Sequence, residues 1–295
     1  MISVAQLLTQ VKSGNFRDLA RTLTIIENEL EGASEFLKTL NTSGTPIIGI
    51  TGPPGAGKST LVNAMINHWS SEGKLIAVLA VDPTSPFNLG SLLGDRIRMS
   101  EQFTKKNVFI RSIATRGSLG GLSGKAIEMT DVLQSVGFDY ILVETVGVGQ
   151  SEVEIAGLAD ISIVVLVPES GDEIQNIKSG LMEIADIFVV NKSDREGADT
   201  FVNNLKNLVH QKSEIIPIIK TSAHRNEGTN ELIAAIENHR LQVNTRRSFL
   251  LAEKAWKLIQ QGRMKDVDKN QLKIDISSES GKSGFNLYSF VESRI

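Results

Sequence analysis

The chain has 295 residues, a net charge of −3 and 41% hydrophobic residues, which suits one large folded domain or one domain with appendages. The small negative charge offers no broad basic surface, so neither nucleic acid nor a membrane is expected as a partner. The absence of cysteine excludes disulfides and thiolate metal sites. No apolar run is long enough to cross a bilayer and the first residues lack a signal-peptide pattern, so we expect a cytoplasmic protein.

Residues 1–44 are expected to form a helical N-terminal extension. Apolar side chains recur at helical spacing through much of this segment, with a break at Ser13-Gly14-Asn15. The run Asn41-Thr42-Ser43-Gly44-Thr45-Pro46 is small and polar, which is typical of a linker. The sequence therefore predicts helices and then a short connection.

Residues 45–240 carry the pattern of an α/β domain. Short apolar runs alternate with helical patterns, and several runs lack the alternation of a half-exposed strand. The runs are Pro46–Thr51, Ile76–Val81, Val108–Ile113, Tyr140–Val143, Ile161–Val167, Ile187–Val190 and Ile215–Ile219. Strands buried on both faces predict a mostly parallel sheet flanked by helices, whose ligands bind at the carboxyl ends of the strands.

A glycine-rich loop follows the first of these runs and precedes an amphipathic helical pattern. It is Gly52-Pro53-Pro54-Gly55-Ala56-Gly57-Lys58-Ser59-Thr60, which fits Gly-x4-Gly-Lys-[Ser/Thr]. Glycines let the backbone wrap a phosphate, and the N–H groups at the helix start point at the anion. We therefore expect a P-loop NTPase fold, with these nine residues binding the nucleotide phosphates. Lys58 would reach the β- and γ-phosphates, and Ser59 would bind Mg²⁺.

Two carboxylates end apolar runs where they can face that loop. Asp82 precedes Pro83, and it either helps to hold Mg²⁺ or caps the turn. Glu144 stands where P-loop enzymes usually carry an aspartate, with Gly147 free to approach the γ-phosphate. The extra methylene of Glu144 still supplies a carboxylate, so both residues are candidate metal ligands, although a strand-end glutamate without function is the alternative.

Two short motifs later in the chain indicate guanine recognition. Asn191-Lys192-Ser193-Asp194 follows an apolar run, and its Asp194 would accept hydrogen bonds from guanine N1–H and the exocyclic amine. Adenine lacks those donors and would leave the carboxylate unpaired. Asn191 would orient the loop, and Lys192 would lie along the ring. In Thr221-Ser222-Ala223 a backbone N–H is a candidate donor to guanine O6, so Ser222 and Ala223 join the predicted site.

Other polar loops are ordinary by residue type alone. They include Asp95, the segment Glu169–Lys178 and the glycine-rich Thr115–Leu122, which is either a hinge or a plain turn. The four histidines form no paired or clustered metal-binding pattern. Residues 241–295 are more polar, with helical patterns at Leu250–Ile259 and Phe285–Val291, and predict a helical C-terminal arm.

Several longer motifs resemble the MeaB/ArgK-type GTPases over about residues 40–240. They are Val81-Asp82-Pro83-Thr84-Ser85-Pro86-Phe87, Gly90-Ser91-Leu92-Leu93-Gly94-Asp95-Arg96, Arg111-Ser112-Ile113-Ala114-Thr115-Arg116-Gly117, Glu144-Thr145-Val146-Gly147-Val148-Gly149-Gln150-Ser151-Glu152 and Gly180-Leu181-Met182-Glu183-Ile184-Ala185-Asp186. The resemblance implies a GTP-hydrolysing chaperone of a cobalamin-dependent acyl-CoA mutase, chiefly methylmalonyl-CoA mutase. Such a chaperone gates adenosylcobalamin delivery and protects or reactivates the mutase.

Site residues and a dimer follow from the same resemblance. It implies a Mg²⁺ set of Ser59, Asp82, Asp95 and Glu144, a further switch loop at Asp172, Gln175 and Lys178, and a homodimer made by residues 241–295. The residues expected to act in catalysis are Lys58, Asp95, Glu144 and Lys178. This chain departs from the family pattern at Ser118, at Glu169-Ser170 and at Asn286-Leu287-Tyr288-Ser289.

Three other functions are alternatives to this one. A nickel-inserting metallochaperone GTPase shares the P-loop but needs thiolate or clustered imidazole ligands. A nucleotide-dependent kinase normally uses ATP, which the guanine motif disfavours. A pure binding module would not need Lys58, Ser59, Asp82 and Glu144 together. No catalytic glutamine or arginine finger is evident, so we expect slow hydrolysis that a partner accelerates.

Overall fold

The computed structural model describes residues 14–42, 44–82, 100–114, 125–145, 151–169, 181–209, 216–239, 245–264, 267–282 and 284–294, with Gln6 and Thr9. The chain divides into two compact units, residues 1–250 and 251–295. Each unit is described by itself. The predicted boundaries at 44/45 and 240/241 stay predictions.

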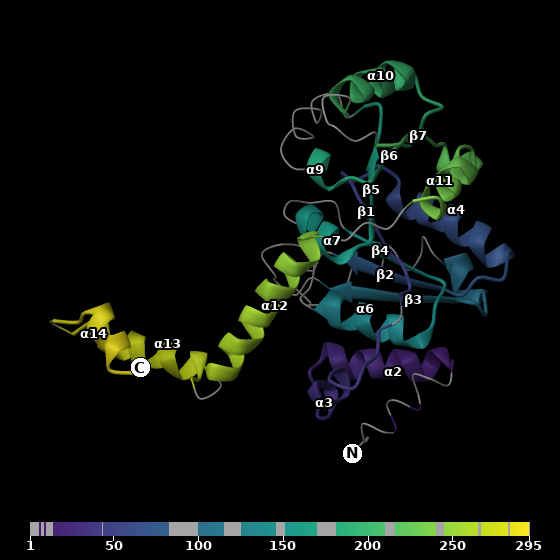
Figure 1. The fold of residues 1–295 in the computed structure, drawn as a ribbon. Helices are drawn as coiled ribbons and strands as arrows, with labels where there is room; N and C mark the ends of the chain where they lie inside the picture. The colour runs from purple at the N-terminus through teal and green to yellow at the C-terminus, as the bar shows by residue number, and fades with distance from the viewer. Residues whose placement is uncertain are drawn as a thin grey trace. The chain divides into compact units, whose positions relative to one another are not determined.

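A seven-stranded sheet forms the centre of the first unit (Figure 1). Its strands are β1 Ile47–Thr51, β2 Ile76–Asp82, β3 Val108–Ala114, β4 Tyr140–Glu144, β5 Ile161–Leu166, β6 Ile187–Val190 and β7 Ile218–Lys220. Their order is β3-β2-β4-β1-β5-β6-β7, and every pair is parallel. The predicted α/β class and parallel P-loop sheet are confirmed.

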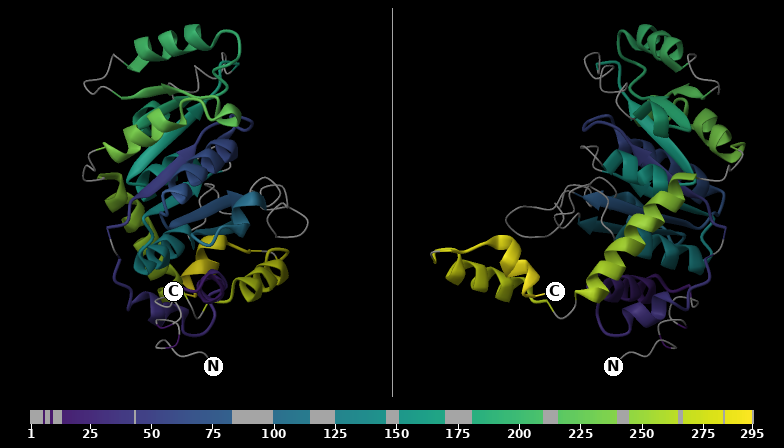
Figure 2. Two further views of the ribbon diagram at one scale, coloured as in Figure 1. Left: turned by 90° about the vertical axis from the view of Figure 1, so that its right-hand side faces the viewer. Right: turned by 60° about the vertical axis from the view of Figure 1, so that its left-hand side comes forward.

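Helices cover both faces of this sheet, as the two views in Figure 2 show. On one face lie α4 Lys58–Ser71 and α11 Thr229–Glu237. On the other lie α2 Phe16–Glu27, α3 Ala33–Leu37, α6 Lys125–Val136, α7 Ser151–Leu158, α9 Met182–Ile184 and α10 Ala198–Val209. The 3-10 turns η1 Ser100–Thr104 and η3 Ala223–Arg225 also belong to this unit. Strands β1, β5 and β6 are buried at every position, which explains their unbroken apolar sequences.

The predicted N-terminal helices belong to this core. Gly14 has a φ of +69°, and Asn15 caps α2 by accepting a hydrogen bond from Arg17 N at 2.9 Å. The helix buries Leu23 and Ile26 completely against the sheet and α6. The predicted break before residue 16 is therefore a capped helix start.

Three aspartates fix the register at the amino edge of the sheet. Asp139, Asp160 and Asp186 each stand one residue before a strand. They accept hydrogen bonds from the backbone N–H groups of Leu75 at 2.7 Å, Ile47 at 2.8 Å and Ser162 at 2.7 Å. Each bond links a strand start to a neighbouring strand, so the opposite, carboxyl edge is also aligned.

Helix α7 lies unusually close to its two neighbours. A Cβ on Gly49 of β1 would stand 2.5 Å from Ile155 Cγ1 and 2.9 Å from Ala159 Cβ. A Cβ on Gly157 would stand 2.9 Å from Leu250 Cβ, in α12 Thr245–Arg263. Glycine on either side therefore allows the helix to approach both the sheet and α12.

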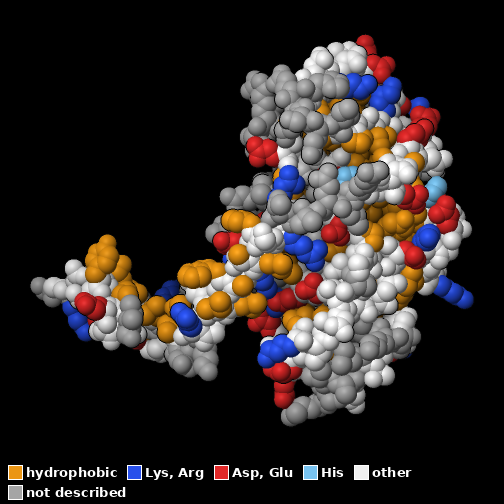
Figure 3. Space-filling view, in the orientation of Figure 1, with side chains coloured by type: hydrophobic (Ala, Val, Ile, Leu, Met, Phe, Trp, Pro, Cys, Tyr) orange, Lys and Arg blue, Asp and Glu red, His pale blue; other side chains and the backbone are white. Residues whose placement is uncertain are grey.

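The second unit contains the end of α12, then α13 Lys269–Glu279 and α14 Leu287–Glu292. The Arg294 guanidinium lies 3.6 Å from the centre of the Phe290 ring and forms an ion pair with Asp275 at 3.2 Å. Large apolar side chains stay exposed, including Trp256 at 64%, Ile274 at 61% and Tyr288 at 83%. Figure 3 shows hydrophobic side chains on the surface of this unit. None of the helices in the described ranges is long and apolar enough to span a membrane.

Candidate nucleotide-binding site

The glycine-rich loop joins β1 to α4 at the carboxyl edge of the sheet. Gly52, Gly55 and Gly57 have φ values of +140°, +78° and +87°, which L side chains rarely adopt. A Cβ on Gly52 would also meet Val165 O at 2.0 Å. The loop residues 52–60 thus form one continuous turn into the helix, which begins at Lys58. The N–H groups of that helix start suit an anion.

Lys58 folds back over the loop that precedes it. Its side chain is 6% exposed, and its ammonium donates to Gly52 O at 2.7 Å and Pro53 O at 3.0 Å. These bonds close the loop into a ring around the position that phosphate oxygens take in such loops. A cation held at this position would suit a phosphate group of a bound nucleotide.

Ser59 and Glu144 meet in a buried hydrogen bond. Ser59 Oγ donates to Glu144 Oε1 at 2.6 Å, and both residues are less than 10% exposed. The register places Glu144 opposite Ile50, one residue before the end of β1. A hydroxyl and a carboxylate are oxygen donors of the kind that Mg²⁺ prefers, so the pair fits this ion chemically.

The other predicted metal ligands are less completely defined. The backbone of Asp82 ends β2, and β2 pairs with β4 on the side of Glu144. The side chain of Asp82 lies outside the described residues, as do Asp95, Asp172, Gln175 and Lys178. Within the described ranges, no group of three His, Asp or Glu side chains has a metal-binding arrangement.

Asn191 connects the glycine-rich loop to the two loops that carry the predicted guanine motifs. Its Nδ2 donates to Ala56 O at 2.8 Å, and its Oδ1 accepts from Thr221 Oγ1 at 3.1 Å and Ala223 N at 3.2 Å. The side chain is 2% exposed, and a Cβ on Gly57 would lie 2.4 Å from its Nδ2. One buried amide therefore joins three loops that follow β1, β6 and β7.

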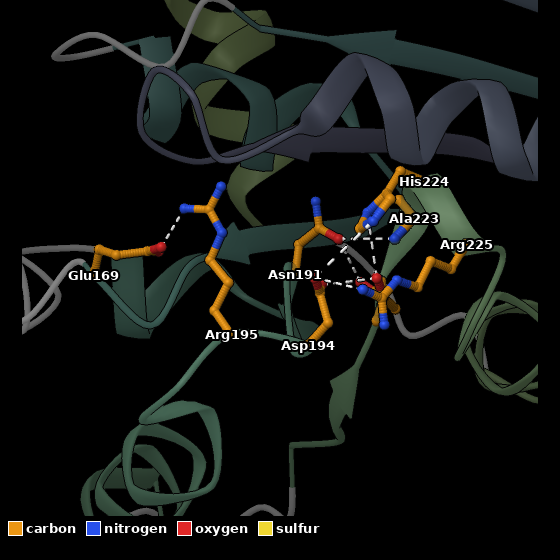
Figure 4. A network of polar contacts seen from close by, with 9 residues as sticks. Glu169, Asn191, Asp194, Arg195, Ala223, His224 and Arg225 are labelled. Atoms are coloured by element: carbon orange, nitrogen blue, oxygen red, sulfur yellow. Dashed lines mark hydrogen bonds and ion pairs between the residues drawn. The ribbon is translucent and has the colours of Figure 1, made fainter.

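Asp194 lies beside this junction with its carboxylate surrounded by donors (Figure 4). Ser222 Oγ donates to Oδ1 at 2.8 Å, and Arg225 Nη2 stands 3.5 Å from Oδ2. The bond from Ser222, with the charges of Arg225 and His224, lowers the pKa of Asp194. The carboxylate is ionised at neutral pH and suits the two N–H donors of guanine.

The backbone of these loops is specialised as well. Lys192 has a φ of +56°, and Ser193 N donates to Thr221 O at 3.0 Å. Ser222 N already donates to Glu227 O at 3.0 Å. The candidate donor to a guanine O6 is therefore the N–H of Ala223, which would be shared between that oxygen and Asn191 Oδ1. The predicted base-site residues 191, 192, 194, 222 and 223 thus lie together.

Sequence motifs missed two parts of this site. Arg195 forms an ion pair with Glu169, which lowers the pKa of Glu169 and joins the loop after β5 to the loop after β6 (Figure 4). His224 and Arg225 approach Asp194, although they lie outside the motif that predicted it. For the ion pair of Arg195 with Glu169, the sequence offers one indication, which is the departure from the family pattern at Glu169.

The chain is similar to several known proteins. The model of the family described as "Methylmalonyl Co-A mutase-associated GTPase MeaB" matches residues 19–272. A putative GTPase of Pyrococcus abyssi is 46% identical over 88% of this chain and 82% of its own length. The mitochondrial "methylmalonic aciduria type A homolog" of Mus musculus is 37% identical over 78% of this chain and 57% of its own length. A crystal structure titled "LAO/AO transport system kinase" shares the fold, with a TM-score of 0.67 and 23% identity, over 95% of this chain and 93% of its own.

Proposed function

This chain belongs to the family of methylmalonyl-CoA mutase-associated GTPases, and from that membership we propose that it hydrolyses GTP and acts as a chaperone of a cobalamin-dependent acyl-CoA mutase. Methylmalonyl-CoA mutase is the proposed client. In this role the nucleotide state gates the delivery of the cofactor and protects or reactivates the mutase. The protein would act in the cytoplasm.

The observation that carries the proposal is the buried amide of Asn191. It bonds to the phosphate loop through Ala56 and to the base loop through Thr221 and Ala223. The phosphate and base halves of the site are therefore one connected structure. A nucleotide that fits both halves is a guanine nucleotide with at least a β-phosphate.

The residues of the chain would share the work of hydrolysis. Lys58 and the N–H groups at the start of α4 stabilise the charge that develops on the transferred phosphoryl group. Ser59 and Glu144 would hold Mg²⁺ with the help of Asp82 and Asp95, and the ion would neutralise charge on the β- and γ-phosphates. Lys178 would relay the nucleotide state to the client. A water molecule attacks the γ-phosphate in line with the leaving oxygen.

We also propose that residues 241–295 form a homodimer. Apolar side chains in this part of the chain are exposed, among them Trp256, Ile259 at 52%, Ile274 and Tyr288. Exposed apolar surface of this kind marks contact with another protein. Light scattering of the full chain and of a Trp256→Glu, Ile274→Glu variant tests the assignment, since the variant is expected to be monomeric.

The first experiment is GTP hydrolysis by the purified protein with and without methylmalonyl-CoA mutase. We expect slow hydrolysis alone and faster hydrolysis with the mutase. Ser59→Ala should abolish both rates while leaving the circular dichroism spectrum unchanged. Fast hydrolysis that the mutase leaves unchanged would remove the chaperone role and leave the GTPase.

Base specificity is tested separately. Asp194→Asn should weaken GTP binding and favour xanthosine triphosphate, because xanthine presents a carbonyl where guanine has its amine. The matched control is Asp199→Asn, since Asp199 is an exposed aspartate of α10 that is paired with a different cation, Lys220, at 2.8 Å. Equal effects of the two substitutions would contradict guanine recognition by Asp194.

A further inference from the structure

The base-recognition carboxylate is surrounded by side chains of its own protein. Asp194 Oδ1 accepts from Ser222 Oγ at 2.8 Å. Its Oδ2 lies 3.5 Å from Arg225 Nη2 and 4.0 Å from His224 Nε2. All three neighbours come from one stretch, Ser222 and the η3 turn (Figure 4). One short segment thus controls the electrostatic surroundings of the carboxylate.

Arg225 is not required to keep Asp194 ionised. An ordinary aspartate already titrates near ~3.9, far below neutral pH. The hydrogen bond from Ser222 is the largest cause of the lowered pKa of Asp194, ahead of the charge of Arg225. At neutral pH the guanidinium therefore changes how strongly the carboxylate attracts other donors and leaves its protonation unchanged.

We propose that Arg225 is a specificity-determining residue that competes with guanine for the carboxylate of Asp194. The inference rests on the proposed function, because it takes Asp194 as the acceptor for the base. Oδ1 is already bonded to Ser222, so Oδ2 is the less occupied oxygen, and Arg225 stands on it. Donors on a base gain less from a carboxylate whose charge a guanidinium already offsets. Arg225 and the base would thus draw on the same carboxylate, and a bound base would weaken the ion pair.

The competition is mild because Arg225 is exposed. Its side chain is 53% exposed, while that of Asp194 is 16% exposed, so Arg225 can turn into solvent as the base arrives. Exposed ion pairs of this kind change equilibria by a factor of about 1.5 to 5. The device therefore tunes affinity and speeds nucleotide release without preventing binding.

The competition also predicts an effect on base discrimination. Guanine offers two donors to Asp194, N1–H and the exocyclic amine, whereas hypoxanthine offers N1–H alone. Removing Arg225 strengthens the carboxylate as an acceptor, so the base with two donors gains more. Arg225 therefore lowers the preference of this protein for guanine over hypoxanthine.

The test compares Arg225→Ala with the wild type by titration calorimetry of guanosine diphosphate and inosine diphosphate at neutral pH. We expect guanosine diphosphate to bind about 2- to 5-fold tighter to the variant and to dissociate more slowly, with a smaller gain for inosine diphosphate. Arg225→Lys, which keeps the charge, should lie between the two. The matched control is Lys220→Ala, which removes an equally exposed cation that pairs with Asp199. That control should leave both affinities unchanged.

Three results would overturn the inference. One is equal or weaker binding of guanosine diphosphate by Arg225→Ala. Another is an equal increase in affinity for guanosine diphosphate and inosine diphosphate in Arg225→Ala. The third is the same increase in affinity in Lys220→Ala. Either of these two results would reveal a general charge effect. Failure of the wild type to bind guanosine diphosphate would instead overturn the proposed function itself, so the two failures are distinguishable.

Discussion

Replacing Asn191 by alanine should destabilise the first unit by about 3 kcal/mol. The substitution removes three hydrogen bonds and leaves Ala56 O, Thr221 Oγ1 and Ala223 N without this partner. Those residues are at most 5% exposed, so water does not easily replace the lost amide. At roughly 1 kcal/mol for each bond, the sum is about 3 kcal/mol, with 2 to 4 as the working range.

Urea unfolding followed by circular dichroism measures this change. On heating, the same loss of about 3 kcal/mol would lower the melting temperature of a unit of this size by roughly 6 to 12 °C. Asn238→Ala is the matched control, because Asn238 is exposed and donates one bond to Ala234 O at 2.7 Å. The control should change the free energy of unfolding by no more than ~0.5 kcal/mol.

A double-mutant cycle separates the Thr221 bond from the other two. Thr221→Val removes the hydroxyl that donates to Asn191 Oδ1 at 3.1 Å. The coupling free energy between the two substitutions should be about 1 kcal/mol. A loss below ~1 kcal/mol for Asn191→Ala, or no coupling to Thr221, would refute the view that this amide joins the loops.

Three further predictions follow from single features. Gly57→Ala should destabilise the protein by about 1 to 3 kcal/mol in urea unfolding and should weaken guanosine diphosphate binding in calorimetry. The reason is that Gly57 has a φ of +87° and that the new Cβ would stand 2.4 Å from Asn191 Nδ2. Gly157→Ala should cost about 1 to 3 kcal/mol in the same unfolding assay, and Leu250→Ala should partly relieve that cost by removing the crowded side chain. Burial, with Glu237 nearby, raises the pKa of Tyr140 to about 12. The phenol then binds its proton more tightly when folded, so its contribution to stability is complete below pH ~10 and is lost as the pH rises towards 12. Absorbance titration of Tyr288→Phe, which leaves Tyr140 as the one tyrosine, checks the value; ionisation near pH ~10 would contradict it.

The sheet could be predicted because its strands are continuous apolar runs. The run Ile187–Val190 is strand β6 without change, and Ile76–Val81 is extended by Asp82 alone. Strand β7 is shorter than predicted. It begins at Ile218, because Pro217 has no N–H to donate, and Ile215 lies outside the described residues.

Helix α13 was harder to predict from its sequence. Its apolar residues Leu272, Ile274 and Ile276 alternate at every second position, which is the period of a strand. The available signal was Asp268, which caps the helix by accepting a hydrogen bond from Asn270 N at 2.8 Å. One capping residue indicates a helix less strongly than three alternating apolar residues indicate a strand.

The motifs named candidate residues for a nucleotide site, and the structure adds how the described ones among them are connected. Asn191 and Ala56 are 135 positions apart, and Arg195 and Glu169 are 26 apart. Such contacts depend on the alignment of strand ends, which local sequence does not encode. Arg225 was missed for the same reason, because its partner Asp194 belongs to a different loop.

The two glycine contacts of α7 restrict how this helix can move. At Gly49 the central strand contributes no side chain, so Ile155 of α7 packs directly on its backbone. At Gly157 the helix contributes none, so Leu250 of α12 packs on the backbone of α7. Neither glycine has a side chain whose rotation could absorb a displacement, so each contact restricts a shift of α7 towards that neighbour. Strand β1, α7 and the start of α12 therefore behave as a single stack. The glycines and the side chains that make these contacts all lie within the first unit, which ends at residue 250.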